Sequence, residues 1–486
     1  MSQSIKNNFV FNLINTVSAL VFPLITFPYA SRILMVDGIG QVQFFQSIIN
    51  YVVLLTSIGI PLYGIKEIAR ARDNKVELSR TTIELVTLSV ILSLVGYIIV
   101  AILCLTVGKV QENIPLFLIL SSTIIMTSIG CPWFYSGIED FKYITVVGII
   151  VKTLCAIFLF CIVKTRDDLL LYGTYTVVGS IGSYLINFVR LRKYISLEGL
   201  SLNDLNIWRH IKPAAAIFLF NIVTSIYINL DTVMLGFLSN STAVGYYTGA
   251  TKISHILVVL VTSLGAVLLP RSSNLLKNGK TDEFYALSAK SYNFISLMTF
   301  PILGGVLVLA PSIILLFCGS GFVPSITTLR IIAPIIVFIG ISNLVGLQML
   351  YPLGKIKLVT LSTCIGATVN LTLNLILIPL MAQNGAAVAT VIAELSVAIA
   401  QLLMVRKLIP FSLINKETFK YFVSSLLMVL ICYGVMSLLN NNDVIRIILV
   451  SFVGMLVYGT IMILSKDKFT LSIWDQIKEH IIKSNG

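Results

Sequence analysis

Charged residues are scarce in this chain. Of its 486 residues, 11% are Asp, Glu, Lys or Arg and 57% are hydrophobic, and the mean hydropathy is +0.96. A water-soluble core cannot bury so large an apolar fraction, so this composition excludes an ordinary soluble globular protein. We therefore expect an all-α polytopic membrane protein, because helices satisfy their own backbone hydrogen bonds inside a bilayer.

Motifs for metals, disulfides and catalysis are also missing. The seven cysteines form no CxxC pair and have no metal-ligand spacing with the three histidines, so we expect no disulfide, no metal and no cofactor. No P-loop, nucleophile elbow or HExxH motif is present, which predicts a chain without catalytic residues or ATP hydrolysis. The net charge is +13, but the basic residues form no single stripe and accompany no recognition motif, so we expect no nucleic-acid partner.

Apolar segments long enough to cross a bilayer fill most of the chain. A helix of about 20 apolar residues spans the hydrocarbon core. This length predicts about fourteen spans, at residues 8–32, 40–64, 82–107, 114–137, 142–163, 169–190, 213–238, 243–270, 291–317, 327–352, 356–381, 385–405, 418–439 and 445–464. An even number of spans places both termini on the same side of the membrane.

The basic residues predict which side that is. Most of the 34 Lys and Arg residues fall in one set of alternate connections, for example Arg72, Lys142 and Arg209. The other set holds few, among them Lys109 and Lys164. Connections rich in Lys and Arg stay in the cytoplasm, so we expect a multi-pass protein with both termini cytoplasmic.

The spans also predict a domain organisation. The polar connection at 191–212 follows the sixth span, close to the middle of the chain. We interpret residues 1–190 as one lobe, 191–212 as a cytoplasmic linker and 213–406 as a second lobe, followed by two further spans at 407–464 and a cytoplasmic tail at 465–486. Six spans are an even number, so equivalent helices of the two lobes would run in the same direction, as parallel repeats.

Two spans carry amide side chains on one face. Asn12 and Asn15 share a face of the first span, and Gln43, Gln46 and Asn50 follow at i, i+3 and i+7 in the second. Amides on neighbouring spans favour a hydrated cavity that can hold sugar hydroxyls. The alternative is static hydrogen bonding between helices.

Lys152 lies near the middle of the span 142–163, on a stripe with Thr145 and Gly148. A lysine at this depth cannot easily reach either surface, so it pairs with a carboxylate, lines water or contacts cargo. We favour contact with an anionic cargo. The alternative is an ion pair with a carboxylate in another span, for which the candidates are Asp231, Glu394 and Glu84.

Three further charges lie inside predicted spans. Asp231 and Lys252 have matching depths below the outer ends of consecutive spans, which favours an ion pair between them. The alternative is that they act separately, Lys252 on the cargo and Asp231 on a coupling ion. Glu394, with Gln401 two turns later, is a candidate proton or cation site.

Three strings resemble motifs of one known family. They are FPYASRILMVDGIGQVQFFQSIINY at 27–51, INLDTVMLGFLSNSTAVGYYTGATKIS at 228–254 and NLTLNLILIPLMAQNGAAVATVIAEL at 370–395. Together they resemble the Wzx-type flippases for O-antigen and other polysaccharide repeat units, which belong to the multidrug/oligosaccharidyl-lipid/polysaccharide exporter superfamily. Arg32, Asp231, Lys252 and Glu394 occupy motif positions, whereas Lys152 lies outside the matching strings.

The resemblance implies a fold, a cargo and a location. The fold would be two six-helix lobes in a V around a central cavity with cationic residues, plus two C-terminal helices. The cargo would be an oligosaccharide linked to undecaprenyl pyrophosphate, exported across a bacterial inner membrane for O-antigen and lipopolysaccharide biosynthesis. The partners would be membrane lipid, a coupling H⁺ or Na⁺, and other polysaccharide assembly proteins.

Two other functions compete with this interpretation. A cation-coupled multidrug exporter of the same superfamily would favour acidic and aromatic cavity residues, because its cargo is cationic, whereas several deep charges here are basic. A membrane-embedded polysaccharide polymerase or ligase would need a sizeable outer loop for its acceptor, and the predicted outer loops are short.

Overall fold

The computed structural model describes residues 5–196, 205–410, 415–439, 442–467 and 470–471, without the side chains of residues 5–7, 9, 219–228, 264, 266 and 267. Every element in this part of the chain is a helix. Ten of the described helices are long and apolar enough to cross a membrane, or eleven if the bent pair Arg166–Ile181 and Ser183–Leu191 forms one span. This confirms an all-α polytopic membrane protein, while the predicted number of fourteen spans remains approximate.

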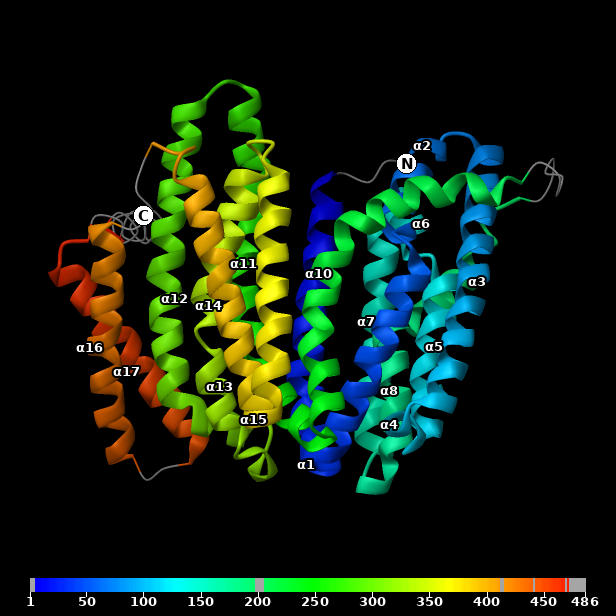
Figure 1. Ribbon diagram of the computed structural model, residues 1–486. Helices are drawn as coiled ribbons and strands as arrows, with labels where there is room; N and C mark the ends of the chain where they lie inside the picture. Colours follow the sequence, from blue (N-terminus) through cyan, green and yellow to red (C-terminus); the bar gives the residue numbers. More distant parts are fainter. Residues whose placement is uncertain (1–4, 197–204, 411–414, 440–441, 468–469, 472–486) are drawn as a thin grey trace, which may run out of the picture. The chain divides into compact units, whose positions relative to one another are not determined.

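The chain divides into two compact units, Met1–Gly245 and Tyr246–Gly486. The helices of the first unit (Figure 1) are α1 (Ile5–Ser57), α2 (Ile60–Ala71), α3 (Lys75–Thr106), α4 (Gly108–Gln111), α5 (Ile114–Gly130), α6 (Pro132–Gly137), α7 (Phe141–Ile162), α8 (Leu169–Ile181), α9 (Ser183–Leu191) and α10 (Ile211–Leu238), with 3₁₀ turns at Arg166–Asp168 and Ile207–His210. The second unit holds most of α11 (Ser241–Lys277), then α12 (Thr281–Phe317), a 3₁₀ turn at Ser320–Phe322, α13 (Ser325–Ile332), α14 (Ile335–Asn343), a π-helical segment at Leu344–Leu350, α15 (Ile356–Val405), α16 (Lys416–Leu438) and α17 (Asp443–Leu464).

Two of these helices each contain two predicted spans. A straight helix of 53 residues, the length of α1, would be about 80 Å long, far more than the bilayer core. Met35 has φ 58° and ψ −172°, and the two arms of α1 run in opposite directions from this point (Figure 1). Ala382 interrupts the 50 residues of α15 in the same way, with φ 48°. Pro23 and Pro28 lie within the first helical arm and do not interrupt it.

The helix is broken near one end of two predicted spans. The span predicted at 40–64 ends at Ser57, because Ile58 and Gly59 both have positive φ and α2 starts in a new direction. The span predicted at 114–137 is interrupted at Cys131, which has φ 46° and precedes Pro132. The short helices α2 and α6 then pack together, and a Cβ atom at Gly64 would lie only 2.8 Å from the Trp133 ring. Hydropathy alone therefore merges the short helices α2 and α6 with the apolar spans that precede them.

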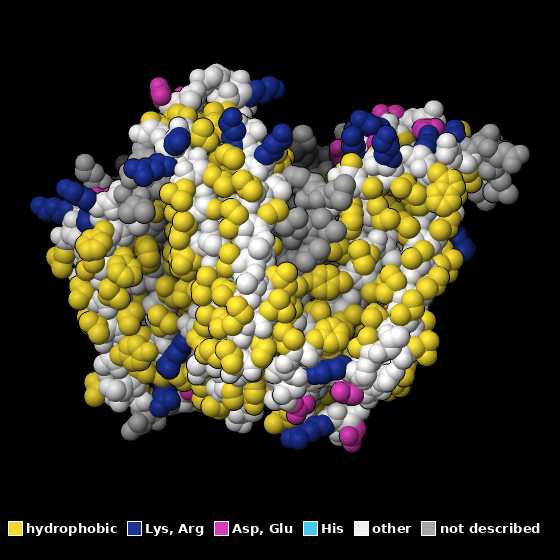
Figure 2. All heavy atoms as spheres, viewed as in Figure 1, with side chains coloured by type: hydrophobic (Ala, Val, Ile, Leu, Met, Phe, Trp, Pro, Cys, Tyr) yellow, Lys and Arg dark blue, Asp and Glu magenta, His cyan; other side chains and the backbone are white. Residues whose placement is uncertain are grey.

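Three connections that the charge pattern places on one side meet in the first unit. Arg72 pairs with Glu139 at 2.8 Å, and Arg190 pairs with Asp140 at 3.0 Å. The Arg190 guanidinium also lies 3.5 Å from the centre of the Tyr143 ring. Figure 2 shows Lys and Arg side chains gathered beyond the hydrophobic band at this end of α2 and α3. The ion pairs therefore join α2, α6 and the end of α9 on one face of the unit.

The connections between the other ends of these helices also meet. The Lys109 ammonium donates to the Ser239 carbonyl at 2.6 Å, and the Asn113 amide donates to Gln41 Oε1 at 3.2 Å. The Thr242 hydroxyl donates to the Asp37 carboxylate. The helices of this unit thus alternate in direction in the predicted order, and the cytoplasmic assignment of one end remains a prediction.

Helix α10 packs with the first unit. A Cβ atom at Gly59 would lie 2.5 Å from the Ala214 carbonyl oxygen, and one at Gly236 would lie 2.0 Å from the Phe44 ring. The compact unit therefore continues past the predicted linker 191–212, of which residues 197–204 lie outside the described part. The division into lobes 1–190 and 213–406 remains a prediction.

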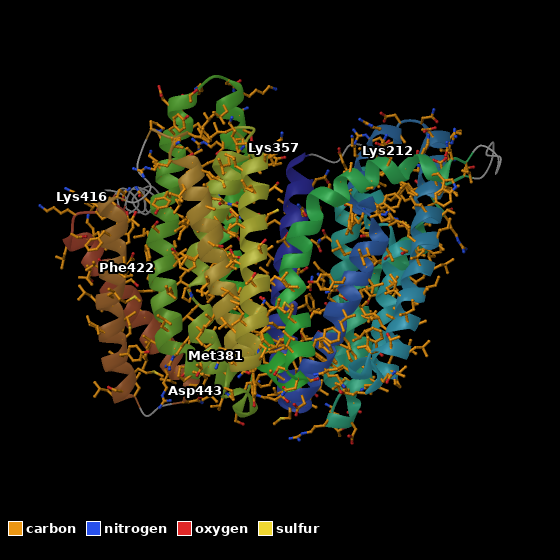
Figure 3. The ribbon with its side chains drawn as sticks, viewed as in Figure 1. Lys212, Lys357, Met381, Lys416, Phe422 and Asp443 are labelled. Atoms are coloured by element: carbon orange, nitrogen blue, oxygen red, sulfur yellow. The ribbon has the colours of Figure 1, made fainter. Side chains whose placement is uncertain are left out.

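The last two helices form a hairpin in the second unit. Figure 3 shows Lys416 and Asp443, the first residues of α16 and α17, at opposite ends of this antiparallel pair. The hairpin packs on α12, because the Ser425 hydroxyl donates to the Phe300 carbonyl at 2.8 Å and the Tyr458 hydroxyl donates to the Leu297 carbonyl at 3.1 Å. Most of the predicted tail 465–486 lies outside the described residues.

Candidate functional site

Lys152 lies close to the middle of α7. It is about eleven residues, or roughly 16 Å, from the start of this 22-residue helix. Its side chain is half-buried, and Nζ donates a hydrogen bond to the Ser18 hydroxyl at 3.2 Å. The structure therefore places a lysine near the middle of an apolar helix of membrane-spanning length, beside a neutral hydroxyl of α1.

The predicted stripe around Lys152 runs along the first arm of α1. The Thr145 hydroxyl donates to the Phe11 carbonyl at 3.0 Å, and a Cβ atom at Gly148 would lie 3.8 Å from Asn15 Oδ1. Further along, the Tyr29 hydroxyl donates to the Val163 carbonyl at 2.8 Å. We call this line of contacts the α1–α7 seam. Asn15 and Lys152 both lie along this seam, while the Asn12 side chain is exposed one turn away.

Two amides of the second arm of α1 are hydrogen-bonded to each other, and one of them, Asn50, also contacts α10. Gln46 Nε2 donates to Asn50 Oδ1 at 2.9 Å, and Asn50 Nδ2 donates to Asn229 Oδ1 at 3.4 Å. The side chain of Gln43 is half-buried on the same arm. These bonds are of the kind that the static alternative predicts, and they add Asn229, which we did not select from the sequence although it lies two residues before Asp231.

Arg32 lies near the end of the first arm of α1, three residues before Met35. Its side chain is exposed, and Nη1 donates to the Pro28 carbonyl at 2.6 Å. The structure thus places this cation close to the turn between the arms, whereas Lys152 lies near the middle of its helix.

The remaining predicted charges are distributed over both units. Asp231 is buried in α10 of the first unit, and Lys252 is half-buried in α11 of the second. Their pairing remains a prediction. Glu394 is buried in α15, and Gln401 on the same helix donates through Nε2 to the Ser362 hydroxyl at 3.0 Å.

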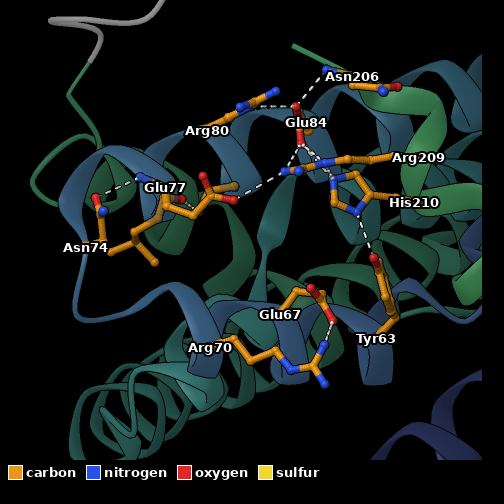
Figure 4. Close-up of polar contacts among 12 residues, drawn as sticks. Tyr63, Glu67, Arg70, Asn74, Glu77, Arg80, Glu84, Asn206, Arg209 and His210 are labelled. Carbon is orange, nitrogen blue, oxygen red and sulfur yellow. Dashed lines mark hydrogen bonds and ion pairs between the residues drawn. The ribbon is translucent and has the colours of Figure 1, made fainter. Parts of the chain in front are cut away.

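A polar network at the charged end of the first unit was not predicted. Glu84, considered above as a partner of Lys152, is fully buried and has other partners (Figure 4). Arg209 Nη2 lies 2.7 Å and His210 Nε2 lies 2.8 Å from Glu84 Oε2. The Asn206 backbone N–H and Arg80 Nε donate to Glu84 Oε1 at 2.7 and 3.2 Å. Glu84 is therefore no longer a candidate partner for an ion pair with Lys152.

Tyr63 extends this network to α2. Its hydroxyl lies 2.9 Å from His210 Nδ1. Burial, reinforced by the Glu67 carboxylate, raises the pKa of the Tyr63 hydroxyl. A cavity of about 210 Å³ borders the network. Its lining residues are Tyr63, Glu67, Arg70, Ala71, Glu77, Thr81, Arg209 and His210.

Comparisons with known proteins identify relatives over most of the chain. The family model described as "Polysaccharide biosynthesis protein" matches residues 4–276. A protein of Escherichia coli (strain K12), named as a candidate O-antigen transporter, is 24% identical over 410 residues, which are 83% of this chain and 97% of that protein.

Solved structures show the same fold. The lipid II flippase MurJ in an inward closed conformation superimposes with a TM-score of 0.70 at 17% identity, covering 94% of this chain and 99% of MurJ. An inward-facing multidrug resistance MATE family transporter of the MOP superfamily gives a TM-score of 0.62 at 14% identity, covering 84% and 95%. The described helices therefore adopt a fold like that of MurJ and MATE.

Proposed function

The chain belongs to the polysaccharide biosynthesis protein family, and from this premise we propose that it is a flippase for lipid-linked oligosaccharides, a transporter and not an enzyme. The cargo is an O-antigen or other polysaccharide repeat unit on undecaprenyl pyrophosphate. It moves from the cytoplasmic to the outer leaflet of a bacterial inner membrane by alternating access. The family match, joined to a relative named for O-antigen transport that aligns over 97% of its length, carries this proposal.

The α1–α7 seam suits the head group of such a cargo. A pyrophosphate diester carries about two negative charges, and the Lys152 ammonium can hold it by charge-assisted hydrogen bonds. Arg32 and Lys252 are the further cationic candidates. The amides that we assign to the sugar hydroxyls are Asn12, Asn15, Gln43, Gln46 and Asn50.

The membrane potential can drive this export. Moving a negative charge outward across an inside-negative membrane is favourable by roughly 2.3 kcal/mol per 100 mV, and the cargo carries about two such charges. Asp231 or Glu394 would be the site of H⁺ or Na⁺ if the transport also uses antiport. What the protein must lower is the barrier for taking sugars and phosphates through hydrocarbon, which polar side chains do by replacing water.

The competing functions have less support. The likeness to a MATE transporter, at 14% identity, is a likeness of fold, and a cationic drug would be repelled by Lys152. A polymerase or ligase has no support from the family match or from the relative named for transport.

Deletion of the gene tests the proposal. We expect the lipid-linked repeat unit to accumulate in the cytoplasmic leaflet, where an externally added glycosidase cannot reach it in intact spheroplasts, and the complemented strain to restore access. A deletion strain that exposes the repeat unit as the parent does would contradict the proposal.

The orientation gives a second prediction. Lys142 and Lys164 are both exposed and lie at opposite ends of α7. By the positive-inside rule, a Lys164→Cys variant should react with a membrane-impermeant maleimide in intact cells, and a Lys142→Cys variant should react only after lysis. Both are made in a chain whose seven native cysteines are replaced. The reverse labelling pattern would show that the termini lie outside.

A further inference from the structure

Glu84 is a buried carboxylate whose partners come mostly from one distant segment. Its side chain has no exposed surface, and Arg80 is the one donor on its own helix. The other donors are the Asn206 backbone, Arg209 and His210, which precede α10 in the chain. Figure 4 shows them converging on the two carboxylate oxygens.

The segment 206–210 is therefore expected to dock on Glu84 as a whole. A buried charge is stable only when hydrogen bonds and opposite charges replace its water, and removing its partners leaves an uncompensated charge. If the segment moved away, Glu84 would keep Arg80 and lose the Asn206, Arg209 and His210 donors together. Docking is thus cooperative, and intermediate positions of the segment are disfavoured.

The docked segment sets the position of α10. The 3₁₀ turn Ile207–His210 continues directly into α10, and the Ala214 carbonyl closely approaches Gly59 in the next turn. Further along the same helix, Asn229 accepts the hydrogen bond from Asn50. A helix is stiff along its axis, so a displacement of the first turn of α10 also displaces Asn229. The position of the first turn therefore determines whether Asn229 can accept the hydrogen bond from Asn50.

We propose that Glu84 is a positioning residue for transport: by holding Asn206, Arg209 and His210 it fixes the first turn of α10 against α2 and α3 and so sets α10 in register with the amides of α1. The transport part of this inference rests on the proposed flippase function. The docking part stands on the geometry of the first unit alone.

A pair of glutamine variants tests the inference in the full-length protein. Glu77 offers a matched control, since it also faces Arg209, at 3.5 Å, but is about half exposed. We expect Glu84→Gln to accelerate hydrogen exchange of the backbone amides of residues 206–215 by about tenfold or more, because a charge-assisted network is lost. We expect the same variant to reduce export at an equal amount of membrane protein, and Glu77→Gln to change neither quantity.

The two measurements separate the possible failures. Unchanged exchange in residues 206–215 would overturn the docking role, and faster exchange with normal export per molecule would overturn the positioning role. If Glu84→Gln does not accumulate, Arg209→Gln replaces it, because it removes one donor and leaves the carboxylate with its others; the same two outcomes then decide. Hydrogen exchange needs no cargo, so a failure of the flippase assignment alone would leave the exchange result intact.

Discussion

Lys152→Ala is expected to abolish export of the lipid-linked repeat unit while the protein remains in the membrane at its normal level. The lysine lies near the middle of the membrane-length helix α7 and contacts a neutral hydroxyl, Ser18, through its ammonium group. Its loss removes the positive charge that we assign to the pyrophosphate, yet replacing a deep charge by a methyl group favours the bilayer. Complementation of a flippase-deficient strain, with immunoblots of its membranes, measures both quantities.

Two variants sharpen this experiment. Lys152→Arg keeps the charge and should retain cargo binding, although tighter bidentate contacts should slow release and lower turnover. Lys164→Ala removes an exposed lysine at the end of the same helix, where Nζ contacts the Phe160 carbonyl, and should leave export unchanged. Normal export by an abundant Lys152→Ala protein would show that this lysine is structural, and the cationic contact would then have to come from Arg32 or Lys252.

Composition and helical spacing predicted the class of fold and part of the seam. The apolar fraction required membrane-spanning helices, and the stripe of Thr145, Gly148 and Lys152 follows from 3.6 residues per turn. The structure adds that this stripe faces α1, with Lys152 at Ser18. Spacing along one helix defines a face, but the helix opposite that face depends on tertiary packing.

The breaks in the helices were less predictable. Met35, Cys131 and Ala382 adopt positive φ although none of them is Gly or Asn, so the residue type at these positions does not predict the break. Proline is an unreliable guide, since Pro132 directly follows the break at Cys131 whereas Pro23 and Pro28 lie inside a continuous helical arm. Packing of the flanking arms, which sequence does not reveal, must offset the cost of these backbone conformations.

The Glu84 network was missed because its residues are far apart in sequence. Arg209 and His210 lie 125 and 126 positions from Glu84, within a stretch that we interpreted as a linker. The available signal was a carboxylate near the basic end of a span together with two adjacent basic residues just before another span. A carboxylate inside a predicted span needs a partner, and the basic residues of a connection at the same end of the span are better candidates than a lysine in the middle of another span.

Gly40→Ala is expected to have the other large effect, on folding itself. A Cβ atom at Gly40 would lie 1.8 Å from the Ser241 carbonyl oxygen and 2.8 Å from the Gly245 backbone nitrogen. Both are backbone atoms at the start of α11 and cannot rotate away as a side chain can. A Cβ at Gly245 would meet the Val36 carbonyl at 2.2 Å, so the close approach depends on glycine in both helices.

Gly40→Ala should lower the free energy of unfolding by more than the loss of about 1–3 kcal/mol that is typical of an overpacked core. To admit the methyl group, the start of α11 would have to move away from α1, and the hydrogen bond from Thr242 to Asp37 would be lost with it. We therefore expect little folded protein, or a melting temperature in detergent lowered by several degrees. Gly108→Ala is the matched control, because a Cβ there meets no atom within 4 Å and should leave the melting temperature unchanged. Equal melting temperatures for Gly40→Ala and Gly108→Ala would show that the first turn of α11 is not seated on α1 in the membrane protein.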